Sequence, residues 1–160
     1  MSRVSIPLIR HNVRCQNCGH EFIVYKLSDF EYGQRLGRTP NPRELGLVVC
    51  FSDPVFQEVG ELVDEFLEPL GKADWQQSRC FDLVFGIACD PSPSGYPYDF
   101  TGKIWCPICG SANEGYGPEA SPRIESMDLP YITHNAWQQL SKAEKREQIR
   151  EALQKAGCLP

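Results

Sequence analysis

Long apolar runs are absent from this sequence. No stretch of its 160 residues approaches the roughly 18 consecutive apolar residues of a membrane-spanning helix. The first residues, which include Arg3 and Arg10, contain no apolar segment of signal-peptide length. We therefore expect a cytoplasmic protein without a membrane partner. At this length it is about one domain and can bury a core of its own.

The sequence also has few residues of the kinds that form active sites. It contains three histidines, His11, His20 and His134. None lies in an H-E-x-x-H sequence, beside a second pair of zinc ligands or in a recognisable nucleophile motif, and no glycine-rich phosphate loop is present. Because an enzyme needs such a constellation, we expect a protein without catalytic residues.

An overall excess of basic residues is missing as well. The formal net charge is −5, with +3 over residues 1–50, −8 over residues 51–100 and zero over residues 101–160. Proteins that bind nucleic acid normally carry a basic patch or stripe. The charge distribution therefore favours a protein partner with a basic surface over nucleic acid.

Cysteine, in contrast, is abundant, with eight in the chain. Four of them form two C-x-x-C-G stretches, Cys15-Gln16-Asn17-Cys18-Gly19 and Cys106-Pro107-Ile108-Cys109-Gly110. Two cysteines at this spacing on a tight turn can direct both sulfurs to one metal ion about 2.3 Å away. Glycine after the second cysteine can adopt the positive φ that closes the turn. We expect one structural Zn²⁺ per chain, held by Cys15, Cys18, Cys106 and Cys109.

Together with Pro107, these residues resemble the paired knuckles of a zinc ribbon. The resemblance implies that each knuckle tops a β-hairpin, with residues 20–25 following the first knuckle and residues 103–105 leading into the second. A simple ribbon has a few tens of residues at most between its knuckles, whereas 87 residues separate Cys18 from Cys106 here. The sequence therefore predicts a ribbon split by an inserted unit.

Three alternatives to zinc remain open. A redox dithiol is typical of a thioredoxin-like fold with a single motif, whereas two matching motifs are present here. Iron in a rubredoxin-like site uses the same ligands, and disulfides would suit a secreted chain. The remaining cysteines are Cys50, Cys80, Cys89 and Cys158. We expect them to be free thiols that act as small buried hydrophobic residues, as in the reducing cytosol.

The predicted architecture is an α+β fold that combines a split zinc ribbon, an inserted small sheet with an amphipathic helix, and a C-terminal helix. The ribbon comprises residues 1–27 and 100–112, the insertion residues 28–99, an extended loop residues 113–132, and the C-terminal helical segment residues 133–160. In the ribbon we expect one strand before the first knuckle and another over residues 22–27.

In the insertion, glycine and proline density predicts a loop, and short apolar runs predict buried strands. The expected elements are a loop over residues 28–45, strands over residues 45–51 and 79–89 that pair with each other, and a helix over residues 54–70. Near the C-terminus, Thr133 or Asn135 can cap a short helical turn. Ser141 and Glu144 form a capping box for a helix that runs to about Ala156 and docks weakly on the body.

The strongest predicted surface feature is the polar face of the helix over residues 54–70. It carries Glu58, Glu61, Asp64, Glu65 and Glu68. No Lys or Arg occurs between Asp53 and Leu70, so favourable i,i+4 ion pairs within the helix are absent. An uncompensated acidic face can steer a basic partner. We expect a protein-interaction module that docks such a partner there, as an inhibitor, an immunity protein or a small assembly subunit.

The alternative is a nucleic-acid-binding or transcription-associated zinc-ribbon protein. Its contact surface would consist of the N-terminal arginines Arg10, Arg14, Arg35, Arg38 and Arg43. Its binding would weaken steeply with salt and with loss of these arginines. Binding through the acidic helix would depend instead on the carboxylates.

Overall fold

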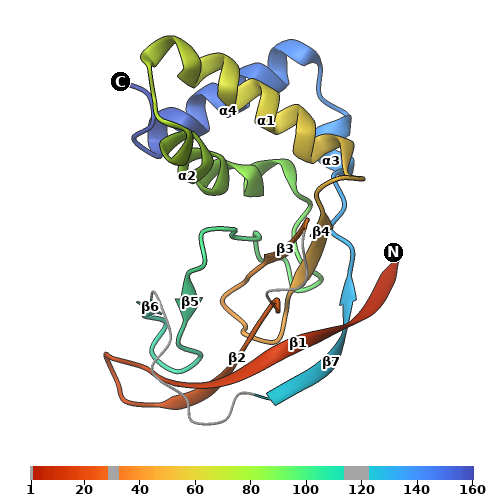
Figure 1. The fold of residues 1–160 in the computed structure, drawn as a ribbon, viewed down its shortest axis with the longest axis vertical. Helices are drawn as coiled ribbons and strands as arrows, with labels where there is room; N and C mark the ends of the chain where they lie inside the picture. Colours follow the sequence, from red (N-terminus) through yellow and green to blue (C-terminus); the bar gives the residue numbers. More distant parts are fainter. Residues whose placement is uncertain (1, 29–32, 114–122) are drawn as a thin grey trace.

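The computed structural model describes residues 2–28, 33–113 and 123–160. Over these ranges the chain is α+β, as expected, with small antiparallel sheets in one half and four α-helices in the other (Figure 1). None of the described helices is long and apolar enough to cross a membrane.

The largest sheet has three antiparallel strands. Strand β1 (Arg3–Arg14) lies in the centre, with β2 (Glu21–Lys26) on one side and β7 (Arg123–Pro130) on the other. The two expected N-terminal strands are confirmed. Ile6 and Leu8 of β1 are buried, and Leu8 is fully enclosed, so alternate residues of this strand supply the core of the sheet.

The expectation of an extended loop over residues 113–132 is wrong for residues 123–130, which form β7. Residues 123–130 pair with β1, with Arg3 opposite Pro130 and Arg10 opposite Arg123. Proline and glycine density obscured the strand, although Met127 and Leu129 already show its two-residue period. Residues 114–122 of the expected loop lie outside the described part of the chain.

Two smaller sheets complete the β half. One pairs β3 (Gln34–Gly37) with β4 (Gly46–Val49), and the other pairs β5 (Ile104–Trp105) with β6 (Ala112–Asn113). Strand β3 lies where a loop was expected. Gly37 and Gly46 face each other in the ladder, and a Cβ on Gly46 would lie 2.5 Å from Ile132 Cγ1. These glycines permit close packing inside a sheet.

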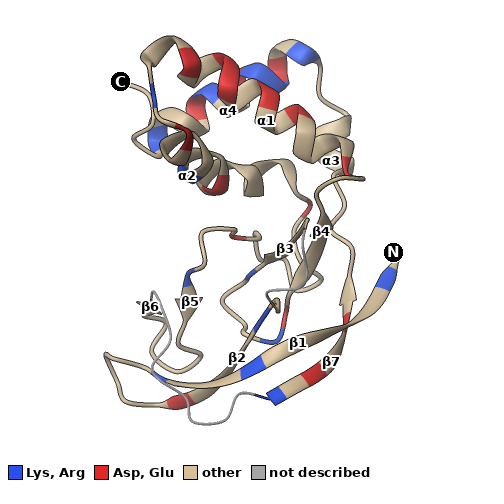
Figure 2. Ribbon diagram, in the orientation of Figure 1, with Lys and Arg blue, Asp and Glu red and all other residues tan. Residues whose placement is uncertain are grey.

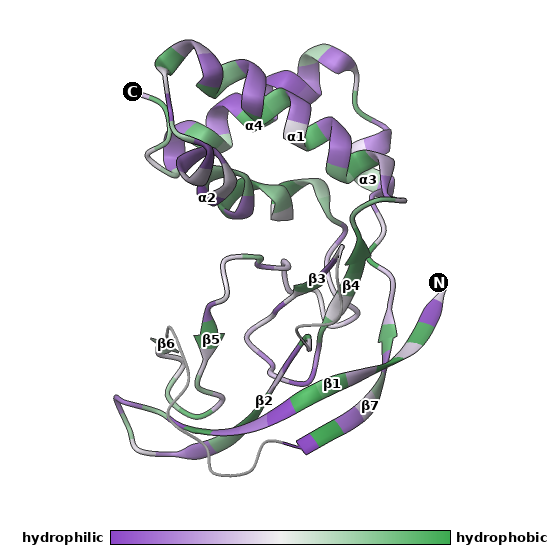
Figure 3. Ribbon diagram, viewed as in Figure 1, coloured by the Kyte–Doolittle hydropathy of each residue, from purple (hydrophilic) through white to green (hydrophobic). Residues whose placement is uncertain are grey.

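The amphipathic helix is confirmed as α1 (Pro54–Leu67), followed by the short 3-10 helix η1 (Glu68–Leu70). Asp53 caps it by accepting hydrogen bonds from the backbone N–H groups of the second and third helical residues. Val55, Val59, Val63 and Leu67 are buried along one side. Apolar and polar stretches alternate along α1 and along α4 in Figure 3.

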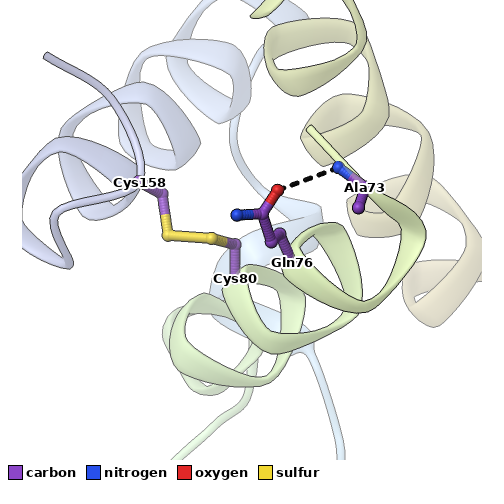
Figure 4. Close-up of a disulfide and its surroundings, with 4 residues drawn as sticks. All are labelled: Ala73, Gln76, Cys80 and Cys158. Carbon is purple, nitrogen blue, oxygen red and sulfur yellow. Dashed lines mark hydrogen bonds between the residues drawn. A yellow bond between two sulfur atoms is a disulfide. The ribbon is translucent and has the colours of Figure 1, made fainter. Parts of the chain in front are cut away.

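The expected strand over residues 79–89 is wrong. The chain there forms α2 (Asp74–Val84) and the 3-10 helix η2 (Phe85–Ala88), so this segment does not pair with β4. Gln76 stabilises the first turn by accepting a 2.9 Å hydrogen bond from the backbone N–H of Ala73 (Figure 4). The buried residues of this segment are Cys80, Phe81, Val84, Phe85 and Ala88, a helical spacing.

The C-terminal segment forms α3 (Asn135–Gln138) and α4 (Lys142–Lys155). The capping box is confirmed, since Ser141 Oγ accepts from the Glu144 backbone N–H at 3.1 Å and Glu144 Oε1 accepts from the Ser141 N–H at 3.0 Å. Ile149 and Leu153 are fully buried in the same core as α1 and α2. The helix is thus part of the core, where only weak docking was expected.

A disulfide joins α2 to the residues after α4. Cys80 and Cys158, 78 residues apart in sequence, form this bond with Cα atoms 6.2 Å apart (Figure 4). The expectation of free thiols is therefore wrong for these two residues, while Cys50 and Cys89 are free. Of the four cysteines outside the two knuckles, two are free and two form a disulfide, which the expected reducing cytosol does not favour.

Candidate metal centre

Each C-x-x-C-G stretch connects two antiparallel strands. The first lies between β1 and β2, and the second lies between β5 and β6. Both knuckles therefore top β-hairpins, as the resemblance to a zinc ribbon implied. The polypeptide between them forms β3, β4, α1 and α2 (Figure 1).

The two knuckles have the same local geometry. In the first, the N–H of Cys15 donates to the carbonyl of His20, and the N–H of Gly19 donates back to Cys15, both at 2.9 Å. The second knuckle repeats the bond between its glycine and first cysteine, from Gly110 to Cys106, also at 2.9 Å. Gly19 and Gly110 have φ values of +77° and +73°, which glycine adopts without a steric penalty.

The four cysteine sulfurs converge on one point. Cys15 Sγ lies 3.6 Å from Cys109 Sγ, and Cys18 Sγ lies 3.6 Å from Cys106 Sγ. All four sulfurs lie within 4.8 Å of one another. Sulfurs at the corners of a tetrahedron with metal–sulfur bonds of about 2.3 Å are about 3.8 Å apart. The predicted four-cysteine cluster is confirmed, and it could hold one metal ion.

One side of the cluster is buried and the other faces solvent. Cys15 and Cys106 are each 2 % exposed, whereas Cys18 and Cys109 are exposed. The inner pair packs in a small core with Val13, Phe22, Val24 and Ile104. That core is supplied by both hairpins, so a bound ion would fasten together the segments that form it.

Their surroundings give the thiols of Cys18 and Cys109 different pKa values. The Ser111 side chain and backbone, together with Asn17, lower the pKa of Cys109 to about 5. The backbone N–H of His20 lowers the pKa of Cys18, but burial and the neighbouring thiols outweigh it and raise that pKa to about 12. Four thiolates this close repel one another, so a metal ion that replaces their protons relieves the repulsion.

Part of the predicted partner-binding face is occupied within the chain. Glu58 accepts hydrogen bonds from Trp137 Nε1 at 2.6 Å and from Lys145 Nζ at 3.2 Å. Glu65 forms an ion pair with Arg146. Figure 2 shows α1 beside α4, with acidic residues on the first and both basic and acidic residues on the second. Helix α4 therefore supplies the cations that α1 itself lacks.

The other three predicted acids, Glu61, Asp64 and Glu68, are exposed. They are three and four residues apart and so lie along one line of the surface, with Glu61 and Asp64 in α1 and Glu68 just after it in η1. Within the described residues, none of the three forms an ion pair. We call these three residues the acidic stripe.

The arginines of the alternative prediction are mostly bound within the chain. Arg10 pairs with Glu125, Arg14 with Glu21 and Arg35 with Asp82, and Arg38 donates to the carbonyl of Tyr25. Arg38 is 9 % exposed, so it is not available to a phosphate backbone. Arg43 is exposed.

A buried polar network that sequence analysis missed joins the starts of α1 and α3 to the end of η2. His134 is 7 % exposed, and its Nδ1 and Nε2 lie 2.7 Å from the Ala88 carbonyl and 2.6 Å from Asp53 Oδ2. Asp90 caps α3 through the N–H groups of Asn135 and Ala136, the role expected of Thr133 or Asn135. Both nitrogens of the His134 ring face an acceptor, which indicates a structural role for the ring.

Comparisons of this chain with protein-family models, with curated proteins and with solved structures found no match. The four-cysteine cluster and the charged surfaces therefore carry the functional argument.

Proposed function

We propose that this chain is a non-catalytic zinc-binding protein whose helical half docks a partner with a basic surface. One Zn²⁺ at Cys15, Cys18, Cys106 and Cys109 would hold the two hairpins together. The acidic stripe would form the docking surface. An inhibitor, an immunity protein or a small subunit of an assembly would act in this way.

The donor set supports a structural metal ion. Four thiolates fill all positions of a tetrahedron, whereas a catalytic zinc ion keeps one position for water or substrate. Soft thiolate ligands favour zinc or iron over magnesium or calcium. Zinc is the proposed ion, because the resemblance to a zinc ribbon extends to both hairpins.

The observation that carries the docking proposal is the division of the acidic face. Glu58 and Glu65 are neutralised by α4, while Glu61, Asp64 and Glu68 remain exposed beside them. Like charges at helical spacing cost a few tenths of a kcal/mol per pair. A partner that supplies Lys or Arg would remove this repulsion and be steered toward the stripe.

The metal part of the proposal is tested with Cys106→Ser. Metal analysis and native mass spectrometry should find one zinc per wild-type chain and little or none in the variant. The loss of cross-linking metal should cost at least about 3 kcal/mol, which is about 10 °C in Tm. Cys50→Ser, which removes a free thiol outside the cluster, is the matched control and should keep its zinc. Iron in the wild type would contradict the proposed ion, and unchanged zinc in Cys106→Ser would contradict the shared site.

The docking part is tested by native mass spectrometry of the chain purified gently from its source cells. We expect a co-purifying basic protein that is lost in the double variant Glu61→Gln/Asp64→Asn. The matched control, Glu147→Gln/Glu151→Gln, removes the same charge from α4 and should retain the partner. If both variants retain the partner equally, or both lose it equally, docking through the acidic stripe is contradicted.

A further inference from the structure

A cleft of about 770 Å³ opens between α2 and the segment that leads into the second knuckle. Trp75, Ser78 and Arg79 line it from α2, and Thr101 and Lys103 line it from the opposite segment. Figure 1 shows this segment running beneath α2 on its way to β5. A volume of this size is in the range of small-molecule binding sites.

Trp75 is an unusual residue at this position. It is 68 % exposed, whereas tryptophan is highly buried on average. Trp75 and Arg79 are one helical turn apart, so the indole and the guanidinium lie on the same face of α2. An exposed indole that the fold does not need for its core is available to stack on a ligand.

The charged side chains that line this cleft without an ion-pair partner are basic, although residues 51–100 carry a net charge of −8. Within the described residues, neither Arg79 nor Lys103 forms an ion pair. The acid that lines the cleft, Asp82, is paired with Arg35. Arg35 also lies 5.5 Å from the centres of the Phe56 and Phe81 rings, which hold it on that side.

We propose that this cleft binds a nucleobase that carries a phosphate group. The base stacks on the Trp75 indole, and the phosphate lies between the Arg79 guanidinium and the Lys103 ammonium group. The Ser78 hydroxyl can hydrogen-bond to the sugar or the phosphate, whereas the Thr101 hydroxyl, which donates to Asp99 Oδ1, can accept a hydrogen bond from a sugar hydroxyl. Stacking on an aromatic side chain beside a cationic groove is how proteins hold single nucleotides without reading their sequence.

This proposal does not depend on the metal or on the acidic stripe. The ligand can be a free nucleotide or one nucleotide of a single strand, because both present the same base and phosphate. An apolar peptide fits the cleft less well, since it would bury Arg79 and Lys103 without a counter-charge. The sequence prediction missed the site because it expected a buried strand over residues 79–89.

The experiment is isothermal titration calorimetry of the full metal-loaded chain. Its probes are adenosine monophosphate, an oligodeoxyadenylate of eight residues and inorganic phosphate. We expect adenosine monophosphate or the oligonucleotide to bind, and Trp75→Ala and Arg79→Gln each to weaken that binding about tenfold or more. Trp75→Phe keeps an aromatic face and should retain most of the affinity. Arg43→Gln is the matched control, because it removes an exposed arginine outside the cleft.

Two results identify the source of the ligand. Binding of adenosine monophosphate supports a free nucleotide, and binding of the oligonucleotide alone supports a single strand. Three results would overturn the proposal. They are no binding of either nucleotide probe at millimolar concentration, binding of inorganic phosphate as tight as that of adenosine monophosphate, and equal weakening in Arg43→Gln. Circular dichroism of each variant checks that the fold is intact.

Discussion

His134 Nε2 lies 2.6 Å from Asp53 Oδ2, although the two are 81 positions apart in sequence. Asp53 caps α1 with its other carboxylate oxygen, so the imidazole ties the start of this helix to the start of α3. Burial lowers the pKa of His134, but the bonds to Asp53 and to the Ala88 carbonyl outweigh it and raise the pKa. Burial raises the pKa of Asp53, but His134 outweighs it and lowers that pKa.

The pair should make stability depend on pH. The contribution of His134 is fully present below its unfolded pKa of about 6.5 and is lost as pH rises through the higher folded pKa. The contribution of Asp53 is present above its unfolded pKa of about 3.9 and is lost as pH falls through the lower folded value. Asp53→Asn retains a capping side chain but removes the charge. We expect it to cost about 2 kcal/mol at pH 5.5 and much less at pH 8.5.

Urea unfolding of wild type and Asp53→Asn across this pH range measures the difference. Asp128→Asn breaks an exposed ion pair with Arg3 and serves as the control, with a cost below about 1 kcal/mol at any pH. A cost for Asp53→Asn that does not change with pH would contradict a charged His134.

Removal of the disulfide should destabilise the helical half without affecting metal content. Cys158→Ser opens the link between α2 and the end of α4, which should cost about 2–4 kcal/mol. Alkylation of the unfolded, metal-free wild type should modify the six free cysteines, and reduction should expose two more. Cys89→Ser, which changes a half-buried free thiol, should leave the disulfide intact. Modification of all eight cysteines before reduction would contradict the bond.

Two glycine substitutions should have opposite effects on stability. Gly46→Ala places a methyl group 2.5 Å from Ile132 Cγ1, and such overpacking costs about 1–3 kcal/mol. Gly60 lies inside α1, where the nearest atom to a new Cβ is 3.9 Å away. Gly60→Ala should therefore raise stability by about 0.5–1 kcal/mol. Thermal unfolding measures the Tm of both variants. An equal shift of Tm in the two would contradict the close packing of Gly46 against Ile132.

Two acids of α1 should differ sharply in their contribution to stability. Glu58→Ala leaves the Nε1 of Trp137, a residue that is 2 % exposed, without its acceptor. This should cost about 1–3 kcal/mol. Glu61→Ala removes an exposed side chain and should change stability by less than about 0.5 kcal/mol. Denaturant unfolding of both variants tests this difference, and similar effects would contradict the division of the acidic face.

The four-cysteine cluster could be predicted from sequence because its geometry is local. The C-x-x-C spacing and the following glycine define each knuckle by themselves, and the pairing of the two knuckles follows from their likeness. The capping box at Ser141 and the apolar period of α1 are local signals of the same kind. Each depends on residues within a few positions of one another.

Features that depend on packing between distant segments could not be predicted. Residues 80–88 are apolar enough for a buried strand, and only the helical spacing of the buried residues and the charge of Asp82 favoured α2. The Cys80–Cys158 bond and the pairing of Glu58 with Lys145 require α4 to lie against α1 and α2. No short-range pattern in the sequence indicates that arrangement.

The central place of β1 has a consequence for how the protein is made on the ribosome. Its hairpin partner β2 follows at once, but its other neighbour β7 begins at Arg123, and the thiols of the first knuckle wait for Cys106 and Cys109. At translation rates of about 5–20 residues per second, the nascent chain carries an unpaired strand edge and two unligated cysteines for roughly 5–20 s. During that interval the open edge of β1 is exposed, so pairing with another chain at this edge threatens the protein most before residues 123–130 have been made.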